Sequence, residues 1–545
     1  MTRLKAYFLL GALTLVCLVP FCGKAFHMDD PLFIWAAQQI AKHPLDPYGF
    51  KVLWYWTAEP MSEVTMNPPL AAYYIAGVGK LAGWSEVVLH LAFLLPALAA
   101  VLGTYRLAER FTRHASLAAL ATLLAPGFLV SSTNIMCDTA MLAAWILATL
   151  LWLEGLDKEK PALLAAGAVM IAVCALTKYF GVALIPLLLV YSIAKKRRAG
   201  SWLLFLLIPV IILAGYQFWT HALYGRGLLS NAALYASADK PTGIVLAARM
   251  LVGLSFAGGC ALPALTFMPV IWSRRGIVFG LLIGAAGALC CELPTIKAAL
   301  GTPPGWSLEL QLCLFIAGGV FLLALAFSDF QKNKDAESAF LLIWVLGAFL
   351  FAAFVNWSVN ARSVLPLIPA VGILLARRVD VTPPLVRVKL IAPLLATGFV
   401  SLWLATADTR WADSAREAAQ YIRDHADVDI SSLSFEGHWG FQYYMQRLGI
   451  HPIDFASYQA GKGKVAVLPE NNSNYDAVPP EHIESQSLLS FCASLGVTIM
   501  QETVGAGFYA DTFGPLPYAF GPSPPEHYTL VHLKGSGLLD PDVIQ

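Results

Sequence analysis

The sequence predicts a mainly α-helical, polytopic membrane protein with about thirteen transmembrane helices, surface helices on its outer face and a small α/β domain at its C-terminus. Two observations predict this fold class. The 545 residues are 58% hydrophobic and only 13% charged, whereas soluble domains average roughly 45–50% apolar and 25% charged residues. Apolar runs near the ~20 residues that cross a bilayer also recur along most of the chain.

The first of these runs follows a short basic start, as in a secretory signal peptide. It continues to about Phe26 and no cleavage-type sequence follows it, so we expect a retained first helix. The predicted spans lie near residues 7–26, 86–105, 115–131, 136–153, 161–176, 179–194, 202–221, 247–272, 277–295, 308–327, 339–356, 363–377 and 389–405.

The orientation follows from the short loops that carry Lys and Arg, because such loops stay in the cytoplasm. Basic clusters occur at residues 106–113, 195–198, 274–275 and 377–378. All of them become cytoplasmic if the N-terminus is inside. An odd number of spans then places the C-terminus outside, which predicts a multi-pass protein of the inner (plasma) membrane.

The chain divides into a transmembrane domain, 1–405, and a soluble extracytoplasmic domain, 406–545. The first outer loop, 27–85, contains two amphipathic segments, 31–43 and 68–83, that are typical of helices lying along the membrane surface. In the C-terminal domain, hydrophobic periodicity predicts helices and strands in alternation. Helices are expected at 413–425 and 439–449, and strands at 431–437, 464–470, 496–503 and 527–534.

Composition also limits the partners and metals. The net charge of +1 gives no basic stripe of the kind that phosphate backbones require, so we expect no nucleic-acid partner. Nine cysteines are present, and none has metal-ligand spacing such as CxxC. No metal site is therefore predicted from ligand spacing.

Five ionisable residues stand at or near the expected outer ends of spans. Asp29 and Asp30 follow the first span, where a carboxylate can serve as a general base or simply end a helix. Asp138 lies at the outer start of a span, where function is favoured over a helix-terminal role because charges at membrane depth are costly. Lys178 and Arg362 lie on the cation-poor outer side and can bind an anion or extend along a helix end to the interface.

Several motifs occur in a defined order along the chain. They are the Asp29–Asp30 pair, the segment NPPL at 67–70, Asp138, the segment TKYFG at 177–181 and the segment RSVLPLIP at 362–369. In this order they resemble the C-type membrane glycosyltransferases, and especially the branch with protein O-mannosyltransferases and the lipid A aminoarabinose transferase. The resemblance covers roughly residues 1–405.

The resemblance implies transfer of a sugar from a polyprenyl-phosphate donor on the extracytoplasmic face, with inversion at the sugar. The implied acceptor of the sugar is a lipid, a glycan or a protein, and membrane lipids are expected to surround the enzyme. The resemblance establishes no cofactor, and it leaves the binding of a divalent cation open. Asp29 is expected to act as the base or to position the acceptor, because Pro31 starts a surface helix there and Asp30 can serve as the cap of that helix. The implied catalytic residues are Asp29, Asp30 and Asp138, and the implied substrate-binding residues are Asn67, Lys178, Tyr179 and Arg362.

Two other functions are open at this point. A transporter or flippase would use intramembrane charges as a substrate route, and it predicts broken helices in corresponding halves of the chain. A non-catalytic envelope assembly protein would use its outer domain for binding, and it would not need Asp29, Asp138, Lys178 and Arg362 to meet.

Overall fold

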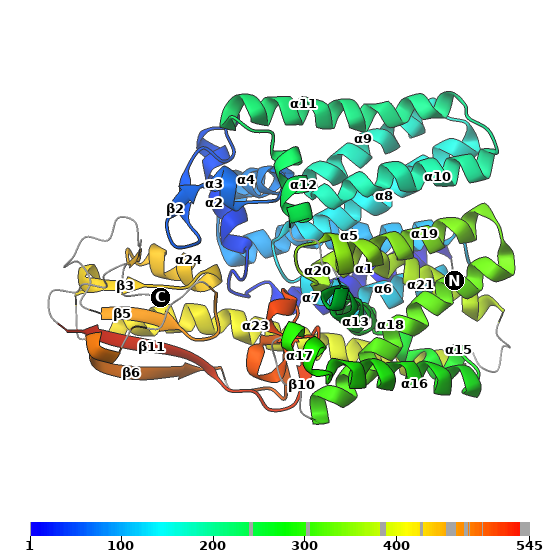
Figure 1. The fold of residues 1–545 in the computed structure, drawn as a ribbon. Coiled ribbons are helices and arrows are strands. Elements are labelled where there is room, and N and C mark those ends of the chain that lie inside the picture. The colour runs from blue at the N-terminus through cyan, green and yellow to red at the C-terminus, as the bar shows by residue number, and fades with distance from the viewer. Residues whose placement is uncertain are drawn as a thin grey trace.

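The computed structural model describes residues 2–238, 243–300, 306–381, 388–425, 429–453, 465–473, 478, 480–492 and 494–534. A bundle of long helices forms one part of the molecule and a small β-rich region lies at one end of it (Figure 1). The N-terminus lies toward the other end of the bundle. The prediction of a mainly helical membrane protein with a small C-terminal region of mixed structure is confirmed at this level.

Within the described ranges, ten helices are long and apolar enough to cross a membrane. They correspond to ten of the predicted runs. These helices are α1 (Arg3–Leu18, extended by η1, Val19–Phe21), α5 (Glu86–Ala108), α8 (Cys137–Lys158), η2 with α10 (Tyr179–Ala183 and Leu184–Lys196), η3 with α11 (Ser201–Leu206 and Leu207–Tyr224), α13 (Gly243–Cys260), α16 (Arg274–Cys291), α18 (Trp306–Asn333), α19 with the π-helical η4 (Ala336–Leu350 and Phe351–Val355) and α23 (Ile391–His425).

The remaining three predicted runs form shorter helices. The run 115–131 is two helices, α6 (Ala115–Leu123) and α7 (Pro126–Ser131), because the chain turns before Pro126, which cannot continue a helix from its N-terminal side. The run 161–176 is the 17-residue α9 (Pro161–Thr177). The run 363–377 is divided among α20 (Ala361–Val364), η5 (Leu365–Leu367) and α21 (Ile368–Asp380).

The first outer loop contains the two predicted surface helices. They are α2 (Asp30–Lys42) and α4 (Leu70–Ala82), with a small hairpin of β1 (Lys51–Leu53) and β2 (Ala58–Pro60) and the short α3 (Met61–Val64) between them. These elements lie at the end of the bundle that faces the β-rich region (Figure 1). Further short helices are α12 (Leu228–Ala238), α14 (Pro263–Thr266), α15 (Met268–Ile271) and α17 (Pro294–Leu300).

Helix α23 continues without a break through the predicted domain boundary at 405/406. The segment 408–425 is more polar than a membrane span, but it contains no Pro or Gly. Its buried positions include Asp408, Ala412, Ala415 and Ala419, at the three- and four-residue spacing of one helix face. One helix therefore carries the chain from the bundle to the β-rich region (Figure 1).

The β-rich region contains a five-stranded mixed sheet in the order β4-β3-β5-β11-β6. Strand β3 is parallel to β4 and β5, and β11 is antiparallel to β5 and β6. The predicted helix 439–449 is α24 (Trp439–Arg447). The sheet strands are β3 (Leu433–Phe435), β4 (His451–Pro452), β5 (Val465–Pro469), β6 (Ile483–Phe491) and β11 (Glu526–Leu533).

Two predictions for this region need correction. Apolar and polar residues alternate only weakly in the sequence of β6, and no strand was predicted there. The single strand predicted at 496–503 is instead two short strands, β7 (Val497–Thr498) and β8 (Met500–Gln501), which pair with β10 (Ala519–Phe520) and β9 (Ala506–Gly507). Lys464, the first residue of the predicted strand 464–470, lies outside the described residues.

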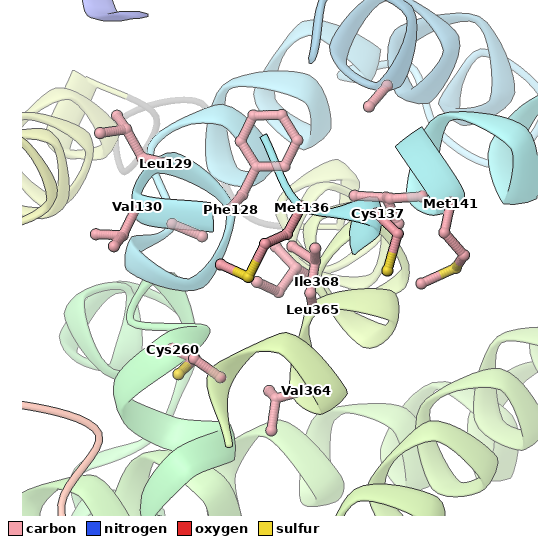
Figure 2. Close-up of a cluster of buried hydrophobic side chains, with 14 of the residues drawn as sticks. Phe128, Leu129, Val130, Met136, Cys137, Met141, Cys260, Val364, Leu365 and Ile368 are labelled. Atoms are coloured by element: carbon pink, nitrogen blue, oxygen red, sulfur yellow. The ribbon is translucent and has the colours of Figure 1, made fainter. Parts of the chain in front are cut away.

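A buried apolar cluster supports α7, the start of α8 and the segment that begins at α20. Figure 2 shows Phe128 and Met136 on one side of this cluster and Val364 and Leu365 on the other, all of them buried. Gly127 allows this close packing, because a Cβ there would lie 2.9 Å from side-chain atoms of both Cys260 and Ile368. The cluster fixes two chain segments that carry charged residues of the cavity described next.

Candidate active site

A cavity of about 800 Å³ lies between the first outer loop, α12, η4 and α20. Six of the seven predicted site residues line it. They come from segments far apart in the sequence, and Asp30 is the one that does not reach the cavity. The six are Asp29, Asn67, Asp138, Lys178, Tyr179 and Arg362.

Asp29 and Arg362 form an ion pair at the cavity. Arg362 Nη1 donates to Asp29 Oδ2 over 2.6 Å. Asp29 is at the N-cap position of α2, but its side chain makes no capping hydrogen bond. Arg362 is held by a capping box, in which the side chain of Asn360 accepts from the Ser363 amide and the Ser363 side chain accepts from the Asn360 amide. The carboxylate of Asp29 is thus oriented by Arg362 and not by its own helix.

The backbone separates the side chains of Asp29 and Asp30. Met28, just before them, adopts the left-handed conformation (φ 47°), which costs roughly 1 kcal/mol or more for a residue with a Cβ. Asp30 is completely buried, and its two oxygens accept the backbone N–H groups of His27 (2.9 Å) and Ile135 (3.1 Å).

This arrangement corrects the expected cap. Asp30 is the first residue of α2, and its carboxylate ties the loop after α1 to the loop before α8 instead of capping α2. Burial raises the pKa of Asp30 to about 7, although the charge of Lys24 opposes the shift. Asp30 therefore shapes the loop that presents Asp29, and it does not share the cavity.

A second ion pair joins Lys178 to Asp138. Lys178 follows the last residue of α9, and its Nζ lies 2.5 Å from Asp138 Oδ1 in the first turn of α8. Asp138 is almost fully buried, and its other oxygen, Oδ2, has no hydrogen-bond partner among the described residues. A buried acceptor of this kind is costly unless a ligand satisfies it. It therefore marks a position for a hydrogen-bond donor, such as a hydroxyl group.

The two other predicted binding residues are polar groups in the cavity wall. The Oδ1 of Asn67 accepts a weak hydrogen bond from Cys137 Sγ at 3.6 Å. The hydroxyls of Tyr179 and Tyr216 lie 2.8 Å apart. The remaining wall is largely apolar or aromatic, and it includes Leu32, Val64, Phe180, Leu229, Leu246, Phe351 and Phe354.

Sequence reasoning missed two contributions to this site. Trp54 and Tyr55 of the first outer loop, which the sequence analysis did not single out, both line the cavity. Tyr509, from the C-terminal region, lies with its ring 5.8 Å from the guanidinium carbon of Arg362. The aromatic content of the first outer loop was a signal for the first contribution, whereas nothing in the local sequence marks Tyr509.

The residues present do not form an evident metal site. Among the described residues, no three His, Cys, Asp or Glu side chains are grouped so that they could hold a metal ion. Asp29 and Asp138 both line the cavity, but each already pairs with a cation.

Comparisons with known proteins show what the chain and its fold are similar to. Residues 66–220 match the family model described as dolichyl-phosphate-mannose-protein mannosyltransferase. No curated protein sequence matches the chain. The oligosaccharyltransferase of Archaeoglobus fulgidus, tethered with an acceptor peptide, superposes with a TM-score of 0.50 at 13% identity, over 85% of this chain and 68% of that one.

Two further structures are similar. AglB from Archaeoglobus fulgidus, in complex with an inhibitory peptide and a dolichol-phosphate, gives a TM-score of 0.51 at 13% identity, over 86% of this chain and 69% of that one. ArnT from Cupriavidus metallidurans, bound to undecaprenyl phosphate, gives 0.47 at 15% identity, over 85% and 93%. The chain is therefore similar to this mannosyltransferase family over residues 66–220, and it shares its fold with the two Archaeoglobus structures.

Proposed function

We propose that this enzyme transfers a sugar from a polyprenyl-phosphate donor to a lipid, glycan or protein acceptor of the cell envelope. One observation carries the proposal: two cations and two carboxylates from four distant segments meet in one cavity whose other walls are largely apolar. Cations bind the phosphate, and the apolar walls suit the lipid chain. The family model for residues 66–220 is named for a lipid-phosphate sugar donor, which supports this choice.

The residues suggest a division of roles. Lys178 and Arg362 contact the phosphate and stabilise the charge that it gains as it leaves. Asp138 Oδ2, which is buried and has no hydrogen-bond partner in the described part of the chain, accepts a hydroxyl of the sugar. Asn67 and Tyr179 present polar groups to the same cavity.

The transfer step forms one bond and breaks one. The acceptor oxygen attacks the anomeric carbon from the side opposite the phosphate, and the bond between that carbon and the phosphate oxygen breaks. Asp29 takes the proton from the acceptor hydroxyl as the new bond forms. The leaving group is polyprenyl phosphate, and attack from the opposite face inverts the anomeric centre.

We also propose that the cavity opens on the extracytoplasmic side of the inner membrane, with the C-terminal domain outside. The basic loop residues support this orientation, because they gather at the other end of the bundle in a network of ion pairs. These pairs include Arg3 and Arg106 with Glu109, Arg106 with Glu154, Arg110 with Asp157, Lys195 with Glu337, and Arg377 with Asp329.

The two rival functions receive less support. An envelope assembly protein gives no reason for Asp29, Asp138, Lys178 and Arg362 to line one cavity, yet all four do. A transporter or flippase would bind the same lipid but would not cleave it. Cleavage of the donor therefore separates an enzyme from both rivals.

The test uses the purified full-length protein in lipid nanodiscs. Undecaprenyl phosphate and undecaprenol, which differ only by the phosphate, are compared as ligands, and only the phosphate is expected to bind. Undecaprenyl-phosphate sugars are then supplied with envelope extract as the source of acceptor, and released undecaprenyl phosphate is measured. Equal binding of the two lipids, or no release with any sugar, would count against the proposal.

A further inference from the structure

The C-terminal region returns from its sheet to the helical bundle and contacts the segment that carries Arg362 (Figure 1). Three hydrogen bonds join the two segments. The Ala361 amide donates to the Phe508 carbonyl at 2.8 Å, and the Asp511 amide donates to the Val359 carbonyl at 3.0 Å. The Val359 amide donates in turn to Asp511 Oδ1 at 3.0 Å. Residues 508–511 therefore bind the backbone immediately before Arg362.

Tyr509 adds a side-chain contact to the same arginine. The guanidinium carbon of Arg362 lies 5.8 Å from the centroid of its ring, a distance at which the ring face attracts the cation. Tyr509 is itself fully buried, with 1% of its surface exposed. Its ring therefore offers Arg362 a fixed contact in addition to the Asp29 carboxylate.

The Tyr509 ring is held in place by the bundle. Its hydroxyl donates to the Asp408 carboxylate in α23 at 3.0 Å and accepts from Asn134 Nδ2 at 2.9 Å. Lys24, which is also buried, bonds both partners, at 2.5 Å to Asp408 Oδ2 and at 2.6 Å to Asn134 Oδ1. Because every member of this network is paired, the ring has little freedom to move.

From these contacts we propose that residues 508–511 are part of the donor-phosphate site, with Tyr509 and Asp511 as positioning residues that fix Arg362 for binding the lipid phosphate. This inference rests on the proposed function. It makes the C-terminal region a necessary part of the active site. A separate binding module attached to a complete transmembrane enzyme would not show these contacts.

Position 511 offers a matched set of variants. Asp511→Ala removes the side-chain acceptor for the Val359 amide, whereas Asp511→Asn keeps an oxygen at the same place. Thr512→Ala is the control, because Thr512 is an exposed residue of the same turn. Hydrogen–deuterium exchange of 359–364 in the full-length protein reports the position of the segment without any ligand. Faster exchange is expected in Asp511→Ala, and wild-type exchange is expected in Asp511→Asn and Thr512→Ala.

Position 509 tests the effect on the phosphate. Tyr509→Leu removes the ring, and it should weaken binding of undecaprenyl phosphate about tenfold, in the range expected for a partly desolvated cation–π contact. Tyr509→Phe keeps the ring and should retain most of the affinity, while losing thermal stability with the hydroxyl. A purely structural role predicts that both variants lose stability and that neither loses affinity.

The outcomes separate this inference from the proposed function. If the wild-type protein does not bind undecaprenyl phosphate, the proposed function fails and this inference fails with it. If the wild-type protein binds it, and folded Tyr509→Leu and Asp511→Ala proteins bind it equally well, only the positioning role is overturned. Weaker binding in these two variants, with wild-type affinity in Asp511→Asn and Thr512→Ala, supports the inference.

Discussion

Arg362 donates a hydrogen bond to Asp29 over 2.6 Å, although 333 positions separate the two residues in the chain. Both side chains stay partly open to the cavity, with 15% and 24% of their surfaces exposed. In a partly buried pair of this kind, the cost of removing both charges from water offsets much of their attraction. The pair matters more for orientation, because one guanidinium can hold the carboxylate and also contact the phosphate of the donor.

Lys178 is the second cation of the proposed phosphate site. Lys178→Ala should weaken binding of undecaprenyl phosphate by about 1.5–3 kcal/mol, the usual value for a hydrogen bond to a charged group. It also leaves the buried Asp138 without its cation, so stability should fall as well. Lys51→Ala, an exposed lysine of the first outer loop, is the control. If the folded Lys178→Ala protein binds undecaprenyl phosphate as tightly as wild type, Lys178 does not contact the phosphate and instead extends to the membrane–water interface.

Asp30 should be important for structure and not for chemistry. Asp30→Asn leaves one oxygen for two backbone donors, so we expect a loss of about 1–3 kcal/mol in stability. Transfer by the folded protein should continue, because Asp30 does not line the cavity. Thermal unfolding and transfer are measured on the same preparation. A stable but inactive Asp30→Asn protein would assign the catalytic role to Asp30 instead of Asp29.

The orientation can be measured with reporter fusions. The gathering of basic loop residues at one end of the bundle predicts that residues near 197 and 275 face the cytoplasm and that residue 430 lies outside. Reporters that are active only in one compartment check each position. A cytoplasmic signal at residue 430 would contradict the placement of the active site on the extracytoplasmic face.

Glu526 predicts a dependence of stability on pH in the C-terminal region. Burial raises its pKa from 4.5 to about 7, although Asn471 donates to it at 3.0 Å. The stability that this group contributes is present below pH 4.5 and is lost as the pH rises through about 7. Glu526→Gln removes the titration, so the variant should gain stability relative to wild type between pH 5 and pH 8. An equal difference in melting temperature at both pH values would refute this.

The sequence was sufficient to predict the cavity residues because they combine two signals. Asp138, Lys178 and Arg362 are charges near membrane depth, where an unpaired charge is costly, and all three also lie in motifs of the resemblance. It was not sufficient to predict which cation pairs with which carboxylate. That pairing depends on helix packing, which brings α9 to α8 and α20 to α2.

Other features left no local signal. Tyr509 lies in the segment that was predicted to be a soluble extracytoplasmic domain, and its contact with Arg362 depends on the return of the chain to the helical bundle. The left-handed Met28 separates Asp29 from Asp30 in a way that spacing does not reveal. The predicted boundary at 405/406 followed the change in composition, but α23 continues because polar residues alone do not end a helix.

The central claim is that Asp29 is the catalytic carboxylate of a sugar transfer from a lipid phosphate. The most direct test is single-turnover release of undecaprenyl phosphate by wild-type and Asp29→Asn proteins, with donor binding measured in parallel so that a chemical defect is not mistaken for weak binding. The substitution keeps the shape of the side chain and removes its basicity. We expect Asp29→Asn to bind the donor nearly as well as wild type and to release no undecaprenyl phosphate. Near-normal release by a folded Asp29→Asn protein would contradict the claim.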